Sequence, residues 1–174
     1  MTMNNNYIYL NTDKTIQTHN ILYSWLCNIN PQYFLSVQFP KHIRSTDLIT
    51  SNKHLKRIMV EFEQFSLKRH WNRKHIPFIA IAEHGKARTW HYHIYIYNCS
   101  FGYLKIKSII NDVSTELNLP HEVLHIEPIF TNGVYPYTSK EIIVDINDHF
   151  DSDRIITSEY LFNLSPTYIP QSHN

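Results

Sequence analysis

The sequence contains little glycine and little cysteine. Only three of its 174 residues are glycine, and none belongs to a glycine-rich phosphate-binding loop of the kind that NTPases use. The two cysteines, Cys27 and Cys99, form neither a disulfide framework nor a metal-ligand spacing, so we expect two reduced thiols. No apolar run approaches the ~20 residues that a helix needs to cross a bilayer, and the first residues lack the order of a secretory signal. These absences predict a cytoplasmic protein with no membrane partner.

Charge is nearly balanced over the whole chain, with a formal net charge of +1, but it is unevenly distributed. Residues 1–140 carry fifteen Lys/Arg and nine Asp/Glu, a difference of +6. Residues 141–174 carry one arginine and six acids, a difference of −5. The densest basic block, residues 53–75, holds seven Lys/Arg and two Glu. Such a block fits a polyanion such as a nucleic acid, and a solvated helix face explains it equally well.

Hydrophobic periodicity predicts alternating strands and helices. The expected strands cover residues 33–39, 77–83, 89–98 and 122–130, with a further strand at 159–164. The expected helices cover residues 18–29, 46–70 and 104–118, with a short one within 131–143. The resulting β-α-β-β-α-β order predicts an α+β, ferredoxin-like or RRM-like fold, in which helices pack on one face of an antiparallel sheet. The other face is expected to be open and to carry the active site.

The chain is long enough for one domain, since a typical domain has roughly 100–200 residues. Within it we expect an N-terminal helical extension over residues 1–32 and a core over residues 33–143. Residues 144–174 form an acidic C-terminal segment that we expect to pack on the same domain or to trail it.

One predicted hairpin carries a candidate metal site. Because side chains two apart in a strand share a face, His91, His93, Tyr95 and Tyr97 should point away from the core. A hairpin centred near residue 87 or 88 sets Glu83 opposite one of the two histidines, with directly opposed Cβ atoms roughly 4.5–5.5 Å apart. Two imidazoles and one carboxylate then form a three-ligand site with open positions for a divalent ion and a substrate oxygen. With twelve histidines a His-x-His pair alone means little, so the prediction depends on the opposing acid and on strand parity.

The segment YPYTSKE, residues 135–141, holds a candidate nucleophile. If Pro136 begins a helix, Tyr137 and Lys140 fall on the same side of it. A phenol with an ordinary pKa near ~10 is a poor nucleophile, and a nearby metal ion or ammonium group would favour its phenolate. A core tyrosine beside a solvated lysine would give the same pattern.

Three segments together resemble the HUH endonucleases: FLSVQF at 34–39, HYH at 91–93 and YTSK at 137–140. Within that family the chain looks most like the single-tyrosine replication-initiator (Rep) proteins of rolling-circle plasmids and small single-stranded DNA replicons. The resemblance covers about residues 33–141. It implies that Glu83, His91 and His93 bind Mg²⁺ or Mn²⁺. It also implies that Tyr137 is the nucleophile and that Lys140 positions the metal or phosphate and assists proton transfer.

The family chemistry is nicking of single-stranded DNA at an origin hairpin or equivalent site, which leaves a 5′-phosphotyrosine and a free 3′-OH that can be rejoined. The DNA would lie across the open sheet face, where Tyr95 and Tyr97 are expected to stack bases. The cations expected to contact phosphates are Lys53, Lys56, Arg57, Lys86 and Arg88. No helicase segment is present in the sequence, so a host or replicon helicase is the expected partner for unwinding.

Two alternative functions stay open at this point. A transposase or relaxase of a mobile element would use the same chemistry on a different DNA target. A non-catalytic single-stranded nucleic-acid-binding domain on the same fold would bind without covalent capture. A two-histidine phosphodiesterase is disfavoured, because the chain has no convincing second His-x-Thr/Ser copy.

Overall fold

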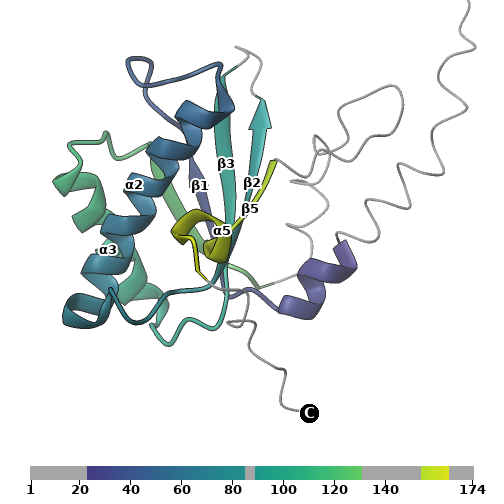
Figure 1. Cartoon of the computed structure of the whole chain (residues 1–174). Helices are drawn as coiled ribbons and strands as arrows, with labels where there is room; N and C mark the ends of the chain where they lie inside the picture. Colours follow the sequence, from purple (N-terminus) through teal and green to yellow (C-terminus); the bar gives the residue numbers. More distant parts are fainter. Residues whose placement is uncertain (1–22, 85–88, 131–153, 165–174) are drawn as a thin grey trace, which may run out of the picture.

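The computed structural model describes residues 23–84, 89–130 and 154–164 (Figure 1). Its strands are β1 (Tyr33–Val37), β2 (Phe78–His84), β3 (Trp90–Ile96), β4 (Leu124–Pro128) and β5 (Ile155–Thr157). Its helices are α2 (Leu48–Leu67), α3 (Tyr103–Glu116) and α5 (Ser158–Phe162), with a 3-10 turn η2 (Lys68–His70), and residues 23–29 are also helical. The predicted helical residues 18–22 and the predicted short helix within 131–143 lie outside this description.

The strands form one antiparallel sheet in the order β4-β1-β3-β2-β5. The first four strands and the helices α2 and α3 follow the predicted β-α-β-β-α-β order, so the ferredoxin-like, RRM-like class is confirmed. β5 extends the sheet beyond β2. The strand predicted at residues 159–164 is wrong, because the Thr157 side chain accepts a hydrogen bond from the Tyr160 backbone N–H and begins α5 there. The strand lies just before it, in the β-branched run of β5.

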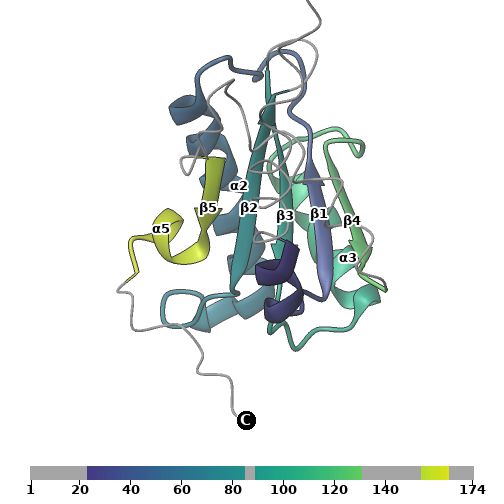
Figure 2. The same ribbon diagram turned by 90° about the vertical axis from the view of Figure 1, so that its right-hand side faces the viewer.

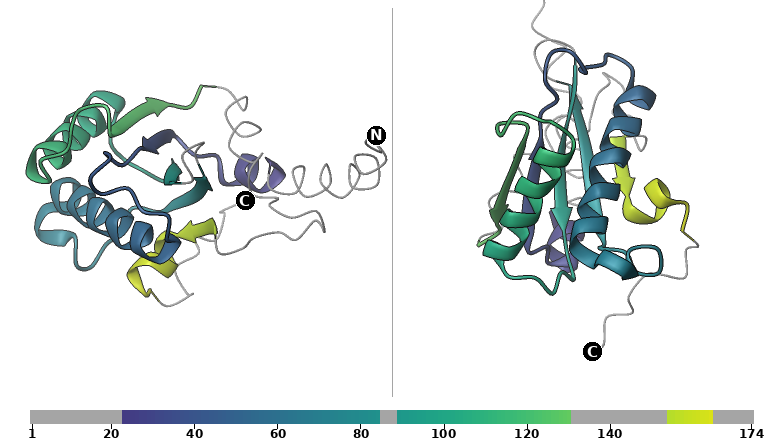
Figure 3. Two further views of the ribbon diagram at one scale, coloured as in Figure 1. Left: turned by 90° about the horizontal axis from the view of Figure 1, so that it is seen from above. Right: turned by 90° about the vertical axis from the view of Figure 1, so that its left-hand side faces the viewer.

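Helices α2 and α3 cover one face of the sheet, as Figure 3 shows. α2 begins where the Asp47 carboxylate accepts a hydrogen bond of 2.8 Å from the backbone N–H of Thr50. Its apolar side, which includes Leu55 and Phe62, is buried in one cluster with Tyr92. This cluster is the main core and holds most of the buried apolar side chains. None of the described helices is long and apolar enough to cross a membrane.

The opposite face of the sheet is not fully open, contrary to the expectation from sequence. Residues 23–29 lie across the end of this face where β2 begins and β3 ends (Figure 2). Leu26 is fully buried there in a second apolar cluster with Ile79, Ile81 and Tyr95. The sequence places Leu26 on the apolar stripe of a helix but does not say which surface that stripe covers. The covered half of the face is therefore core, and only the half near the β2–β3 turn stays outside this second cluster.

We predict that Leu26→Ala lowers the free energy of unfolding by about 2–5 kcal/mol, because it leaves a cavity between the N-terminal helix and the sheet. Leu104→Ala is the matched control, since Leu104 is 82% exposed on α3 and its truncation should cost no more than about 0.5 kcal/mol. Urea unfolding followed by circular dichroism measures both. Equal costs for the two variants would show that Leu26 does not hold the helix on the sheet.

Candidate metal centre

The pairing of β2 with β3 sets Glu83 directly opposite His91, and Ile81 opposite His93. The residues between them, Ala82 and Tyr92, pair with each other and belong to the helix-covered core. Glu83 and both histidines therefore share the face that points away from α2 and α3. The predicted parity and register are confirmed. The turn residues 85–88, with the glycine expected to tighten the turn, lie outside the described residues.

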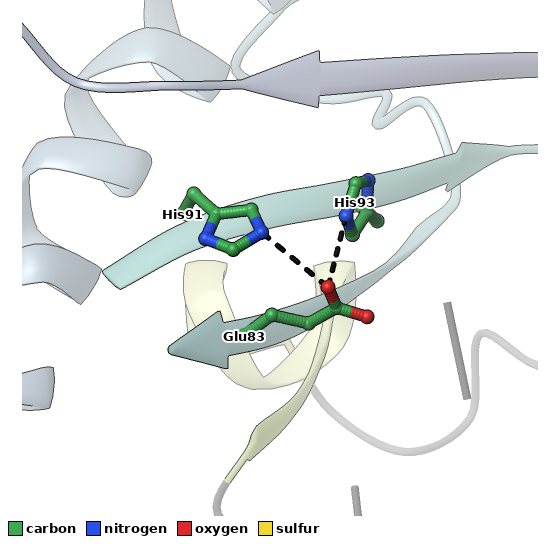
Figure 4. Close-up of side chains that lie close together, drawn as sticks. All are labelled: Glu83, His91 and His93. Atoms are coloured by element: carbon green, nitrogen blue, oxygen red, sulfur yellow. Dashed lines mark hydrogen bonds and ion pairs between the residues drawn. The ribbon is translucent and has the colours of Figure 1, made fainter. Parts of the chain in front are cut away.

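The three side chains converge on one point (Figure 4). Glu83 Oε2 lies 3.3 Å from His91 Nε2 and 3.1 Å from His93 Nε2, and the three candidate ligand atoms lie within 4.8 Å of one another. Ligand atoms bound at ~2.1 Å to one ion stand roughly 3.0 Å apart in an octahedron and roughly 3.4 Å apart in a tetrahedron. The two separations from Glu83 Oε2 fall in that interval, whereas the limit of 4.8 Å on the whole group exceeds it. The group can therefore hold a metal ion once the two imidazole nitrogens adjust around it.

Burial and charge also fit a cation. Glu83 and His93 are buried, and the His91 side chain is 22% exposed, so the centre reaches solvent past His91. Burial alone would raise the pKa of Glu83, but the hydrogen bonds and charges of His91 and His93 outweigh it and hold that pKa below its ordinary value. Glu83 Oε1 is buried and has no hydrogen-bond partner within the described part of the chain. A bound cation would neutralise the carboxylate, and each imidazole would then present a lone pair in place of a proton.

The His93 ring is positioned by Phe34, a residue that the sequence did not single out. Phe34 of β1 stacks on His93 with ring centroids 5.3 Å apart and planes 13° apart. The ring of His91 stands nearly perpendicular to that of His93, at 86°. Alternation in FLSVQF does put Phe34 on the site face of β1. Its contact with His93 could be foreseen only with the strand order, which sets β1 beside β3.

The structure corrects the predicted DNA-binding tyrosines. Tyr95 is fully buried in the cluster that contains Leu26, so its ring has no exposed face on which a base could stack. Tyr97 is half-buried and packs against the same cluster. Burial, together with the charge of Glu159, raises the pKa of Tyr97 to about 12. The parity of both residues was predicted correctly, and the error came from the N-terminal helix that covers this part of the sheet.

Three of the predicted phosphate contacts lie on the wrong side of the sheet. Lys53, Lys56 and Arg57 are exposed on the outer side of α2, and α2 packs on the face opposite to the one that carries Glu83. A DNA strand that lies across the Glu83 face does not run over them. The structure does not describe two further predicted phosphate contacts, Lys86 and Arg88. It also does not describe the predicted catalytic pair, Tyr137 and Lys140. Their roles stay predictions.

Basic residues that sequence reasoning missed stand at the same end of the sheet as the metal centre. Lys41, His42 and Arg44 are exposed in the loop between β1 and α2. This loop is tied to the start of β3, because the backbone N–H of Trp90 donates to Ser45 O at 3.2 Å and the indole N–H donates to Thr46 O at 3.1 Å. Trp90 directly precedes His91, so the loop is fixed beside the centre. A short charged run between two elements gives no signal of this in the sequence.

Comparison with known protein families, with curated proteins and with solved structures finds no match to this chain. The metal centre is thus supported by the geometry and burial of its own residues.

We predict that the chain binds one divalent cation at this centre, with Mn²⁺ as the probe in isothermal titration calorimetry. His91→Ala removes one ligand and should weaken binding at least about tenfold. Loss of a residue that only hydrogen-bonds to a metal ligand already weakens binding by that much. His125→Ala is the matched control, because His125 is an exposed histidine on β4 outside the cluster. Unchanged Mn²⁺ affinity in His91→Ala would place the ion elsewhere.

Proposed function

We propose that the protein is a metal-dependent nickase of single-stranded DNA of the HUH type, most like a Rep protein that initiates rolling-circle replication. The observation that carries the proposal is the convergence of Glu83, His91 and His93 on one point, in the fold that the resemblance implies. A transposase or relaxase would use the same centre, and the DNA target separates these functions from replication.

The donor set bears on the identity of the metal. Mg²⁺ prefers oxygen ligands in a near-ideal octahedron, whereas two imidazoles and one carboxylate are softer. Between the two ions that the resemblance implies, this set favours Mn²⁺. When bound, such an ion supplies a Lewis acid that withdraws charge from a non-bridging phosphate oxygen.

The covalent step belongs to Tyr137 and Lys140, whose roles follow from the resemblance. The Tyr137 phenol oxygen forms a bond to phosphorus while the bond from phosphorus to the 3′ oxygen breaks. The phenol gives up its proton to solvent water, and the leaving 3′ oxygen takes one from Lys140 or water. The products are a 5′-phosphotyrosine and a free 3′-OH, and the reverse reaction rejoins the strand without ATP.

The substrate strand approaches the centre at the end of the sheet where β2 ends. His91 is the most exposed member of the cluster and meets the phosphate first. Lys41, His42 and Arg44 stand in the loop fixed beside it, and we assign them the phosphate contacts that Lys53, Lys56 and Arg57 cannot make there. Base stacking on Tyr95 has no part in this path, because that ring is buried.

The covalent intermediate gives the first test. Purified protein with Mn²⁺ and single-stranded origin DNA should give a slowly migrating covalent adduct on a denaturing gel. Tyr137→Phe should abolish it, because the attacking oxygen is lost, while Tyr160→Phe should leave it unchanged, since Tyr160 is an exposed tyrosine on α5. Lack of an adduct with any replicon sequence, or an undiminished adduct with Tyr137→Phe, would favour a non-catalytic binding domain.

The two imidazoles give the second test. Replacing both His91 and His93 by Ala should abolish cleavage and leave most single-stranded DNA binding, because phosphate contacts dominate affinity. The matched control replaces His121 and His125, both exposed, and should keep both activities. Cleavage is followed on gels and binding by fluorescence anisotropy. Surviving cleavage in the first double variant would contradict the assignment of the hairpin as the catalytic centre.

A further inference from the structure

The connection between α2 and β2 covers residues 68–77. Its first part, residues 68–75, is a basic surface that the metal centre does not use, and we call this part the α2–β2 loop. Four exposed cations lie on it, and they are Lys68, Arg69, Arg73 and Lys74. Trp71 lies between them in the sequence and is 38% exposed. The sequence has no Asp or Glu from Gln64 to Ala82. None of the four ion pairs found between described residues includes one of these four cations.

A buried carboxylate holds the end of the α2–β2 loop. Glu63 of α2 is 1% exposed, and one of its oxygens accepts a hydrogen bond of 2.8 Å from the Ile76 backbone N–H. Its other oxygen lies 2.8 Å from His75 Nδ1, and Phe162 of α5 stacks on the His75 ring. Burial raises the pKa of Glu63 against these hydrogen bonds. A buried acid is costly unless it is fully hydrogen-bonded, and here both oxygens fix the loop.

The beginning of the same loop is strained. Lys68 has φ of 51° and ψ of −127°, a positive-φ conformation, outside the left-handed helical region, that residues other than glycine rarely adopt. Hydrogen bonds from Trp71 N to Lys68 O at 3.1 Å and from Lys74 N to His70 O at 3.0 Å fold the segment into successive turns. Strained backbone persists only where the surroundings enforce it, and it gathers at functional positions. Strain at one end and a buried acid at the other thus fix the backbone of the loop that carries the four cations and Trp71.

We propose that the α2–β2 loop is a second binding surface for single-stranded DNA, with a base stacked on Trp71 and phosphates on the four cations; the identity of this ligand rests on the proposed function. An exposed aromatic residue with exposed cations on both sides of it in the chain suits a single strand, because the bases of a single strand are free to stack. The occupant is therefore a single strand rather than a duplex or an acidic protein surface.

The position of the loop sets the length of strand required. The loop and the metal centre lie at opposite ends of β2 (Figure 1). The five residue steps from Phe78 to Glu83 span roughly 17 Å at ~3.3 Å per residue. A DNA strand that contacts both the loop and the metal centre must follow the length of β2, so it must include more nucleotides than those at the cleavage site.

Binding of single-stranded DNA to the full chain without metal, measured by fluorescence anisotropy, tests the proposal. With an oligonucleotide of about 30 nucleotides, longer than common binding sites, Trp71→Ala should weaken binding at least about fivefold, and Trp71→Phe should restore most of it. Arg73→Gln with Lys74→Gln should lower the slope of log K against log salt by about 1.4. The matched control is Lys105→Gln with Lys107→Gln on α3, which removes the same charge from exposed positions and should leave the slope near that of the wild type.

The outcomes separate this inference from the proposed function. If DNA binding depends on the α2–β2 loop but the chain forms no covalent adduct, the loop is supported as a binding surface and the proposed nickase function is rejected. If the chain nicks DNA while the Trp71 and Arg73/Lys74 variants bind like the wild type, only the inference about the loop surface is rejected. If the Arg73/Lys74 variant and the Lys105/Lys107 control lower the salt slope equally, the effect comes from the net charge of the protein and the proposal is overturned. The same variants can also be tested for binding to vesicles with anionic lipid. If they lose binding to such vesicles and still bind single-stranded DNA like the wild type, the surface belongs to a membrane and the proposal is overturned.

Discussion

The pairing of Glu83 with His91 across the β2–β3 hairpin is the constraint on which the rest of the structure depends. A slip of one residue in either strand would turn its side chains to the other face and break up the cluster. The register is held by the core, because Ala82 and Tyr92, which alternate with the site residues, are fully buried beneath the helices. Ordinary apolar packing on one face of the hairpin thus fixes the positions of the ionisable groups on the other.

The surroundings of the hairpin reinforce that register. Trp90 links several parts of the chain: it donates to Ser45 and Thr46 of the loop before α2, and its ring lies 5.0 Å from the Arg154 guanidinium. The Tyr92 hydroxyl lies 2.6 Å from the side-chain oxygen of Asn52 in α2. These contacts bring the β1–α2 loop, α2 and the residue before β5 against one short strand. The centre is therefore supported from the helix layer and from the sheet edge, while its solvent side is reached past His91.

Local patterns predicted much of the fold and of the centre, because alternation and helical spacing are local properties of the sequence. They gave the element order, the face of His91 and His93, and the acid opposite them. They could not say what the Leu26 stripe covers, so the burial of Tyr95 was missed. They placed Lys53 correctly on the solvent side of α2, but not on the side of the sheet remote from Glu83. The first error concerns how distant elements pack, which period and parity do not encode. The second was avoidable, because the predicted fold already put the helices on the face opposite to the site.

The central claim is that Glu83, His91 and His93 hold one cation together, and pulsed electron paramagnetic resonance of the Mn²⁺-loaded chain tests it most directly. Coordination by both imidazoles predicts modulation from two directly bound histidine nitrogens, reduced to one when His91 alone is replaced. Mn²⁺ that shows no coupling to nitrogen, or an unchanged spectrum after both histidines are replaced, would contradict it.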